Sequence, residues 1–335
     1  MIKKILAFTL FVFFFTACKK DASVGPMEGS MDDVAFNNYQ KFFLNELWKL
    51  NPDWATTVGY HKYDSLLFVP DKKYREKLLN FSKVQLDSLG KYAPASFLET
   101  NKMDYAMMQN QMQYMQWQIE QLKDYEWDPS YYNPIGTFAY ILNEHYAPLP
   151  KRLTSFYQKM ANLPLYYKEA EKQIKNPVPE LTDLAIEQHL GGVSIFEGDF
   201  ADSLKKTTIP EATKKLMLDR AKLSADAIKQ YAAYLKNLKN DKPRSFRLGK
   251  QLYEDKFKYA IQSSSTAQQI YNAAIERKKY IHHEMAKICL KIWPKYFGTK
   301  PMPTDTLEMI GKMIDTLSSK HVAPNEFQDA IEKQL

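Results

Sequence analysis

The 335-residue chain has 45% hydrophobic residues, enough for a sizeable buried core, and a net charge of +7 at pH 7. Its basic residues are interleaved with Asp and Glu, which argues against a nucleic-acid partner and favours a solvated helical surface. With only Cys18 and Cys289, no intramolecular disulfide framework is expected, and Cys289 is predicted to be a small buried core residue.

The start of the chain has the pattern of an export signal. Two lysines precede an apolar run over residues 5–15, which is shorter than the about 20 residues that a membrane-spanning helix needs. Thr-Ala-Cys at 16–18 resembles the bacterial lipoprotein signal, in which Cys18 becomes the first mature residue and carries the acyl chains. By the same resemblance, Lys19 indicates the outer membrane. An ordinary secretory signal with an incidental cysteine is the alternative.

The predicted organisation is a signal peptide over 1–17, a flexible tether over 18–31 and a helical domain over 32–335. The tether contains Gly, Ser and Asp without apolar periodicity. Beyond it, few glycines and many Lys, Gln, Met and Leu predict an all-α array with little or no strand. Prolines punctuate the connections, and we expect about nine or ten helices.

Two segments show the helical period most clearly. In the first, the apolar positions are Tyr105, Met108, Met112, Met115, Ile119 and Leu122. In the second, the inward positions are Met217, Ala221, Ser224, Ile228, Tyr231, Leu235 and Leu238. A methionine stripe can bind a soft metal such as copper. Because the first stripe continues into Ile119 and Leu122, a packed core is favoured.

Between these segments lie an aromatic loop and two acid–histidine pairs. The loop WDPSYYNP, residues 127–134, could stack on a sugar or line a peptide groove, or simply hold the loop on the helical body. Glu144-His145 and Glu187-Gln188-His189 could each orient a histidine for general-base work. A hydrogen-bonded or exposed histidine is the simpler interpretation of both pairs.

The stretch YIHHEMAKICL, residues 280–290, contains half of the HExxH zinc-protease motif in a predicted helix. In that motif two histidines four residues apart bind zinc, but here Lys287 stands at the second position and a protonated ammonium has no lone pair. The predicted buried stripe of this helix is Ile281, Met285, Ile288 and Ile292. It leaves His283 facing water. We therefore predict a structural helix, opened by a capping box at 265–268.

Several landmarks follow one another across residues 35–330. They are NPDWATTVG (51–59), YD (63–64), WDPSYYNP (127–134), PLPKRL (148–153), AIEQ (185–188), FRLGKQLY (246–253), MAKI (285–288) and WPKYFG (293–298). No single landmark is specific, but their order and spacing resemble the Domain of Unknown Function 885 family of bacterial exported proteins.

The resemblance implies a distant relation to helical zinc peptidases. Full-length members of the family carry a metal motif in a C-terminal half, so the chain, which ends at Leu335, resembles the N-terminal half. It implies zinc for the full-length protein, but no zinc ligand or catalytic glutamate can be assigned to a residue of this chain. The chain alone is therefore expected to bind no cofactor and to be inactive.

Two functions follow from the resemblance and the residues. The first is the substrate-groove half of a lipid-anchored metallopeptidase that acts on peptides. The second is a non-enzymatic surface lipoprotein that binds glycans or peptides through aromatic loops. For the groove, the candidate residues are Tyr253, Lys256, His145 and His189.

Overall fold

The computed structural model describes residues 31–319 and 321–334, so the signal, most of the tether and Cys18 lie outside the described residues. About 77% of the described residues are helical, and none of them lies in a strand. The all-α prediction is confirmed. The predicted number of nine or ten helices is wrong, because the described residues form fifteen α-helices, several of them only one or two turns long. Short helices occupy turn-rich stretches between prolines, and apolar periodicity cannot detect elements of so few residues.

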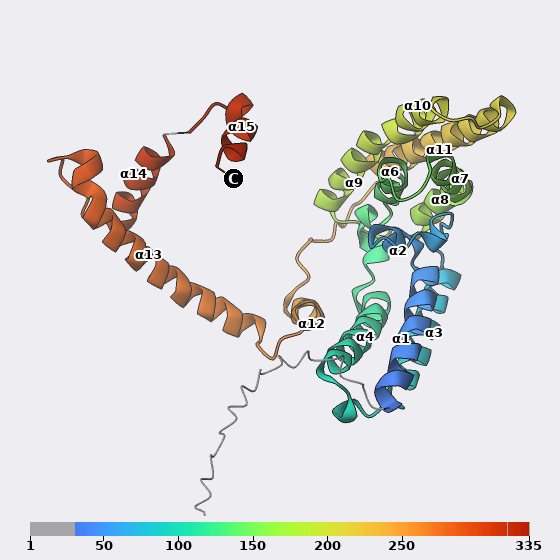
Figure 1. Cartoon of the computed structure of the whole chain (residues 1–335), viewed down its shortest axis with the longest axis horizontal. Helices are drawn as coiled ribbons and strands as arrows, with labels where there is room; N and C mark the ends of the chain where they lie inside the picture. Colours follow the sequence, from blue (N-terminus) through green and yellow to red (C-terminus); the bar gives the residue numbers. More distant parts are fainter. Residues whose placement is uncertain (1–30, 320, 335) are drawn as a thin grey trace, which may run out of the picture. The chain divides into compact units, whose positions relative to one another are not determined.

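The helices follow one another with short connections (Figure 1). The first eight are α1 (Met31–Leu50), α2 (Pro52–Thr57), α3 (Lys72–Leu89), α4 (Glu99–Trp117), α5 (Asp124–Trp127), α6 (Ile135–Asn143), α7 (Leu149–Lys159) and α8 (Leu163–Gln173). The others are α9 (Pro179–Gly192), α10 (Phe200–Lys205), α11 (Glu211–Asn237), α12 (Lys250–Ile261), α13 (Ala267–Phe297), α14 (Thr306–Ser318) and α15 (Phe327–Glu332). Pro52 and Pro179 begin their helices, as the fixed φ of proline favours.

The chain divides into two compact units. Unit 1 comprises the residues up to Met115, Asn133–Glu169 and His189–Tyr231. Unit 2 comprises Gln116–Tyr132, Ala170–Gln188 and Ala232–Leu335. Each unit has buried apolar side chains of its own.

The core of unit 1 contains a group of four phenylalanine rings from α6, α7, α10 and the turn before α10. The Phe156 ring lies 4.4 Å from Phe200, 4.8 Å from Phe138 and 5.5 Å from Phe196, measured between centroids. All four rings are buried. Such offset and edge-to-face contacts add to the free energy gained by burying the rings.

Most residues of the two periodic stripes lie in the core, as predicted, whereas Tyr105, Ile119 and Leu238 are half-buried. Met108, Met112 and Met115 are buried on α4, and Leu122 is buried in the π-helical turn Gln118–Leu122 that follows it. On α11 the buried stripe runs from Met217 through Ala221, Ser224, Ile228 and Tyr231 to Leu235. Both stripes therefore serve packing.

In unit 2, α14 lies beside the C-terminal part of α13 (Figure 1). Their shared core consists of Cys289, Trp293, Met309, Ile310 and Met313. Burial of Cys289, which raises the pKa of its thiol, confirms the predicted core role.

The predicted buried stripe of α13 is partly wrong. Ile281 and Ile288 are exposed, whereas the neighbouring face with Cys289 is buried against α14. Two adjacent apolar faces exist on this helix, and the periodicity alone does not say which one packs. His283 is exposed, as predicted. The capping box is formed by Thr266 and Gln269, one residue later than predicted.

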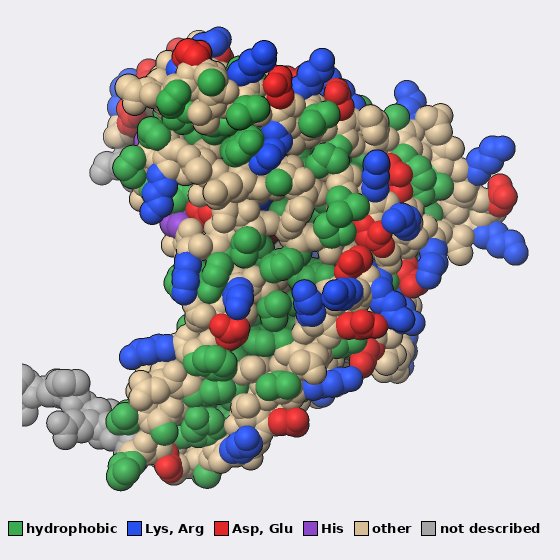
Figure 2. All heavy atoms as spheres, turned by 90° about the vertical axis from the view of Figure 1, so that its right-hand side faces the viewer, with side chains coloured by type: hydrophobic (Ala, Val, Ile, Leu, Met, Phe, Trp, Pro, Cys, Tyr) green, Lys and Arg blue, Asp and Glu red, His purple; other side chains and the backbone are tan. Residues whose placement is uncertain are grey.

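On the face drawn in Figure 2, Lys and Arg side chains lie among Asp and Glu side chains. This interleaving agrees with the scattered charges of the sequence, and it is typical of a solvated helical surface. None of the described helices combines the length and the apolar character that crossing a membrane requires.

Candidate functional site

The landmark FRLGKQLY, residues 246–253, forms the entry into α12. Gly249 has φ +80° and directly precedes the helix as its N-cap. A side chain at this left-handed φ would be strained, which is why glycine is suited to the position. The turn at Gly249 brings the residues before α12 next to its first turn, and a pocket forms between them.

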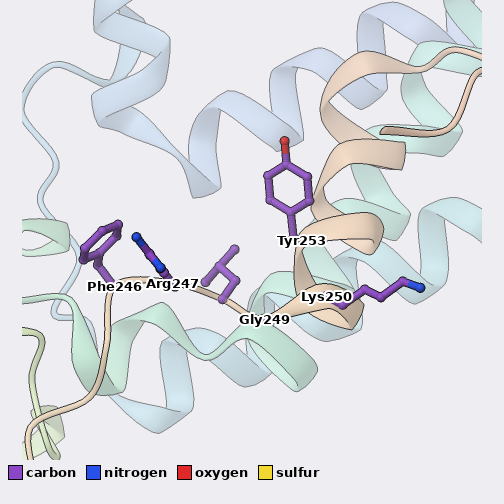
Figure 3. A pocket seen from close by; sticks show the side chains of 6 residues that line it. Phe246, Arg247, Gly249, Lys250 and Tyr253 are labelled. Carbon is purple, nitrogen blue, oxygen red and sulfur yellow. The ribbon is translucent and has the colours of Figure 1, made fainter. Parts of the chain in front are cut away.

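This pocket, called here the α12 pocket, has a volume of about 440 Å³. It is lined by Phe246, Arg247, Leu248, Gly249, Lys250 and Tyr253. Figure 3 shows Phe246, Arg247 and Tyr253 pointing to one side of the segment, whereas Lys250 extends away from them. The rings of Phe246 and Tyr253 are 53% and 54% exposed, so solvent and ligands can reach the aromatic walls.

The α12 pocket has a positive electrostatic character. Among the described residues, no carboxylate forms an ion pair with Arg247, whose guanidinium carbon lies 5.8 Å from the Phe246 ring centroid. The first turn of α12 carries no acidic residue, and the free N–H groups of a helix start favour anions. Lys250 is 4.0 Å from Glu254 on the surface of the helix. The pocket thus combines one unpaired cation with two exposed rings.

Lys256 has surroundings different from those of Tyr253. It is not among the residues that line the α12 pocket. Its charge instead acts on the carboxyl of Asp124 at the start of α5. One turn further along α12, the Tyr259 ring lies 5.8 Å from the Trp117 ring between centroids. This side of α12 therefore contacts the 117–127 segment, and the role predicted for Lys256 in a groove stays a prediction.

The two candidate histidines lie in unit 1, whereas Tyr253 and Lys256 lie in unit 2. His145 is exposed in the connection after α6. His189 is fully buried, with its ring 5.4 Å from Tyr167 and 5.0 Å from Tyr231 between centroids. Enclosed by these two tyrosine rings, His189 has no exposed surface that a ligand could contact.

The aromatic loop 127–134 is mostly packed. Trp127 and Tyr132 are buried, and their polar atoms donate hydrogen bonds to the carbonyls of Leu122 and Tyr125. The Arg244 guanidinium lies 4.5 Å from the Trp127 ring centroid. Tyr131 is 45% exposed. Trp127 and Tyr132 thus fix the loop to the preceding segment. Little aromatic surface of the loop is left for a ligand to contact.

A polar cluster that the sequence analysis did not find surrounds Asp64, which is 2% exposed. Its carboxylate accepts hydrogen bonds from Thr56 Oγ1 at 2.7 Å and from Tyr146 Oη at 2.5 Å. His61 Nδ1 lies 3.1 Å from the same carboxylate, and the imidazole stacks on the Tyr146 ring. Burial, followed by the hydrogen bond to Asp64, raises the pKa of Tyr146. The cluster joins the landmarks near residues 51–64 to the segment before α7.

The sequence matches the family described as "Bacterial protein of unknown function (DUF885)" over residues 52–335. The chain belongs to the DUF885 family. A solved structure of a proposed lipoprotein of unknown function from Shewanella oneidensis is similar to it, with a TM-score of 0.81 and 39% identity. The similarity covers 89% of this chain and 55% of the Shewanella chain, so this chain spans about half of that length. No curated protein matches the chain.

The DUF885 resemblance implies zinc for a full-length member of the family. Among residues 31–319 and 321–334, no group of three or more His, Cys, Asp or Glu side chains is placed to hold a metal ion. Zinc takes its ligands from such nitrogen, sulfur and oxygen donors. No zinc ligand is assigned among these residues, and no chemical step is derived through the ion.

Asp124, at the start of α5, should make the stability of the protein depend on pH. Burial, with a smaller contribution from Asp128, raises the pKa of Asp124 to about 6 from 3.8. The folded state therefore keeps a proton that the unfolded state releases, so the contribution of Asp124 to stability is greatest below pH 4 and is lost as the pH rises through 6. The Asp124→Asn variant should be up to about 3 kcal/mol more stable than the natural chain at pH 7.5, with no difference at pH 4.

Thermal unfolding of the two chains at both pH values measures this difference. Asp315→Asn serves as the control, because Asp315 is exposed on α14 and its replacement should leave the midpoint within a degree or so. An equal effect of Asp124→Asn at pH 4 and pH 7.5 would show that the carboxyl does not titrate as described.

Proposed function

We propose that the chain is a lipid-anchored protein of the bacterial cell envelope, at the outer membrane, that binds peptides through the α12 pocket. This proposal rests on Arg247, which has no carboxylate partner among the described residues, and on the exposed rings of Phe246 and Tyr253 that line the same pocket. The Thr-Ala-Cys18 pattern supports the anchor, as does the likeness to a protein described as a proposed lipoprotein. By the relation to zinc peptidases, the pocket would belong to the substrate-contacting part of a hydrolase.

The pocket fits the carboxyl end of a peptide. A guanidinium presents a planar fork of N–H donors that matches both oxygens of a carboxylate. The start of α12, directly after Gly249, adds backbone N–H groups and the positive end of the helix dipole. The two rings would pack against an apolar or aromatic side chain of the last peptide residue. These contacts would fix the orientation of a peptide.

The described residues of this chain would bind and orient the peptide and exclude water around its apolar side chain. The alternative, glycan binding through the aromatic loop, has little support, because Trp127 and Tyr132 are buried. We therefore assign the ligand contact to the α12 pocket.

The proposal predicts which side chains matter for peptide binding. A pool of short peptides with an aromatic last residue and a free carboxylate is titrated into the full chain by calorimetry. Arg247→Gln and Tyr253→Ala should each weaken binding about tenfold or more, since a lost charged contact or ring contact is worth about 1.4 kcal/mol or more.

Lys250→Gln is the matched control. It removes a positive charge three residues from Arg247, but the Lys250 side chain extends away from Phe246, Arg247 and Tyr253. Binding by this variant should change less than about threefold. If Lys250→Gln and Arg247→Gln weaken binding equally, net charge rather than the pocket attracts the peptide. If no peptide of the pool binds, the proposal is wrong.

A further inference from the structure

A second pocket lies in unit 1, between α10 and the first two turns of α11. Its volume of about 460 Å³ falls within the range of small-molecule pockets, about 300–1,000 Å³. Its lining residues all belong to the His189–Tyr231 part of unit 1, whereas the α12 pocket belongs to unit 2. This pocket, called here the α10–α11 pocket, is therefore separate from the one that we assign to peptides.

Apolar side chains form part of the lining of the α10–α11 pocket. Leu204, near the end of α10, is buried, and Leu218 on α11 is 40% exposed. Both leucines line the pocket. A ligand that contacts them removes apolar surface from water, which is favourable. The pocket can therefore accept an apolar group or a short chain.

Three lysines line the same pocket, and two of them are held by a neighbouring carboxylate. Lys205 pairs with Asp202, and Lys214 pairs with Glu211, each at 2.8 Å. The Lys214 side chain is only 14% exposed. Because an ammonium group has three N–H donors, each of these lysines keeps donors for a ligand.

The third lysine, Lys215, has no carboxylate partner. Within residues 31–319 and 321–334 it forms no ion pair, although Asp219 follows it by four residues. The lining contains three lysines and one glutamate, so it carries two net positive charges. Asp202, outside the lining, is close enough to the exposed Lys206 to interact with its charge. The neighbouring carboxylates therefore leave an excess of positive charge at the pocket.

We infer that the α10–α11 pocket binds a phosphate monoester that carries a short apolar chain. At pH 7 such a phosphate has a charge of about −1.5 to −2, which matches the two net positive charges of the lining. Lysine binds phosphate as a point charge, whereas arginine is best suited to a planar carboxylate, and the described lining contains no arginine. The chain would lie against Leu204 and Leu218. The inference does not depend on peptide binding at α12.

Calorimetric titration of octyl phosphate into the full chain tests the inference. We expect one molecule to bind per chain. Inorganic phosphate should bind at least tenfold more weakly, because burial of about two methylene groups already contributes that factor. Octanoate should bind at least about threefold more weakly, since it carries a single charge. Equal affinity of octyl phosphate and either of these two probes would overturn the inference.

Lys215→Gln should weaken the binding of octyl phosphate about fivefold or more, because the unpaired ammonium group is lost. Lys222→Gln is the matched control. It makes the same change of charge about 10 Å further along α11, outside the lining of the pocket, and should alter the affinity less than about twofold. Both lysines are exposed, so both variants should keep the thermal midpoint of the natural chain. Equal weakening by the two variants, or no binding of octyl phosphate to the natural chain, would overturn the inference.

A second measurement distinguishes the source of the phosphate. The natural chain and both variants are sedimented with phosphatidylcholine vesicles that contain phosphatidic acid, whose head group is a phosphate monoester. Vesicle binding that Lys215→Gln weakens and Lys222→Gln does not would assign the pocket to a lipid head group. Binding of octyl phosphate without vesicle binding would assign it to a free phosphate monoester. Both results support the inference.

Discussion

Replacing Asp64 with alanine is expected to lower the free energy of unfolding by about 3 kcal/mol. Asp64 is 2% exposed, and its carboxylate accepts hydrogen bonds from the hydroxyl groups of Thr56 and Tyr146. Without it, these hydroxyl groups and the His61 imidazole lose a charged acceptor in a place that water reaches poorly. Each such loss costs about 1.5–3 kcal/mol, and partial relaxation of the cluster limits the sum.

Chemical denaturation followed by circular dichroism measures the change. Asp64→Asn should have an intermediate effect, because its amide oxygen still accepts one hydrogen bond while its NH₂ group cannot accept the other. Asp87→Ala is the control, since Asp87 is exposed on α3 and its loss should cost less than about 0.5 kcal/mol. Equal effects of Asp64→Ala and Asp87→Ala would mean that the cluster contributes nothing to stability.

Phe156→Ala is expected to destabilise unit 1 by about 3–5 kcal/mol. The side chain is fully buried and contacts the rings of Phe138, Phe196 and Phe200. Truncation removes the transfer free energy of the ring and leaves a cavity, which three rigid neighbouring rings can fill only in part.

The control for this substitution is Phe42→Ala on α1, because the Phe42 side chain is 57% exposed and its loss opens no cavity. It should cost less than about 1 kcal/mol. The same denaturation experiment decides between the outcomes. A loss below 1 kcal/mol for Phe156→Ala would show that the four rings do not form a packed core.

The long helices α4 and α11 could be predicted from the sequence, because each buries one face and its apolar residues therefore recur with the 3.6-residue period of a helix. On α13 the period was equally clear, but it marked two adjacent apolar faces, and the partner of the buried one, α14, is joined through a proline-rich connection. Which face packs depends on how the chain turns at residues 298–305, and local pattern does not determine that. Short helices such as α5, which follows the left-handed Lys123 and has only four residues, are too short to show a period.

The candidate site was partly predictable. Tyr253 was found through the landmark that contains it, but Arg247 in the same landmark was missed, because its lack of an acidic partner is visible only in three dimensions. The Asp64 cluster was missed for a similar reason, since Tyr146 is 82 residues from Asp64 in the sequence. Burial of His189 was also hidden, because Tyr167 and Tyr231 come from other helices.

The most direct test of peptide binding at the α12 pocket compares two forms of one peptide. A short peptide with an aromatic last residue is titrated into the full chain as the free carboxylate and as the C-terminal amide. We expect the carboxylate form to bind at least tenfold more tightly, and we expect Arg247→Gln to remove this difference. Equal affinity of the two forms for the natural chain would contradict this expectation.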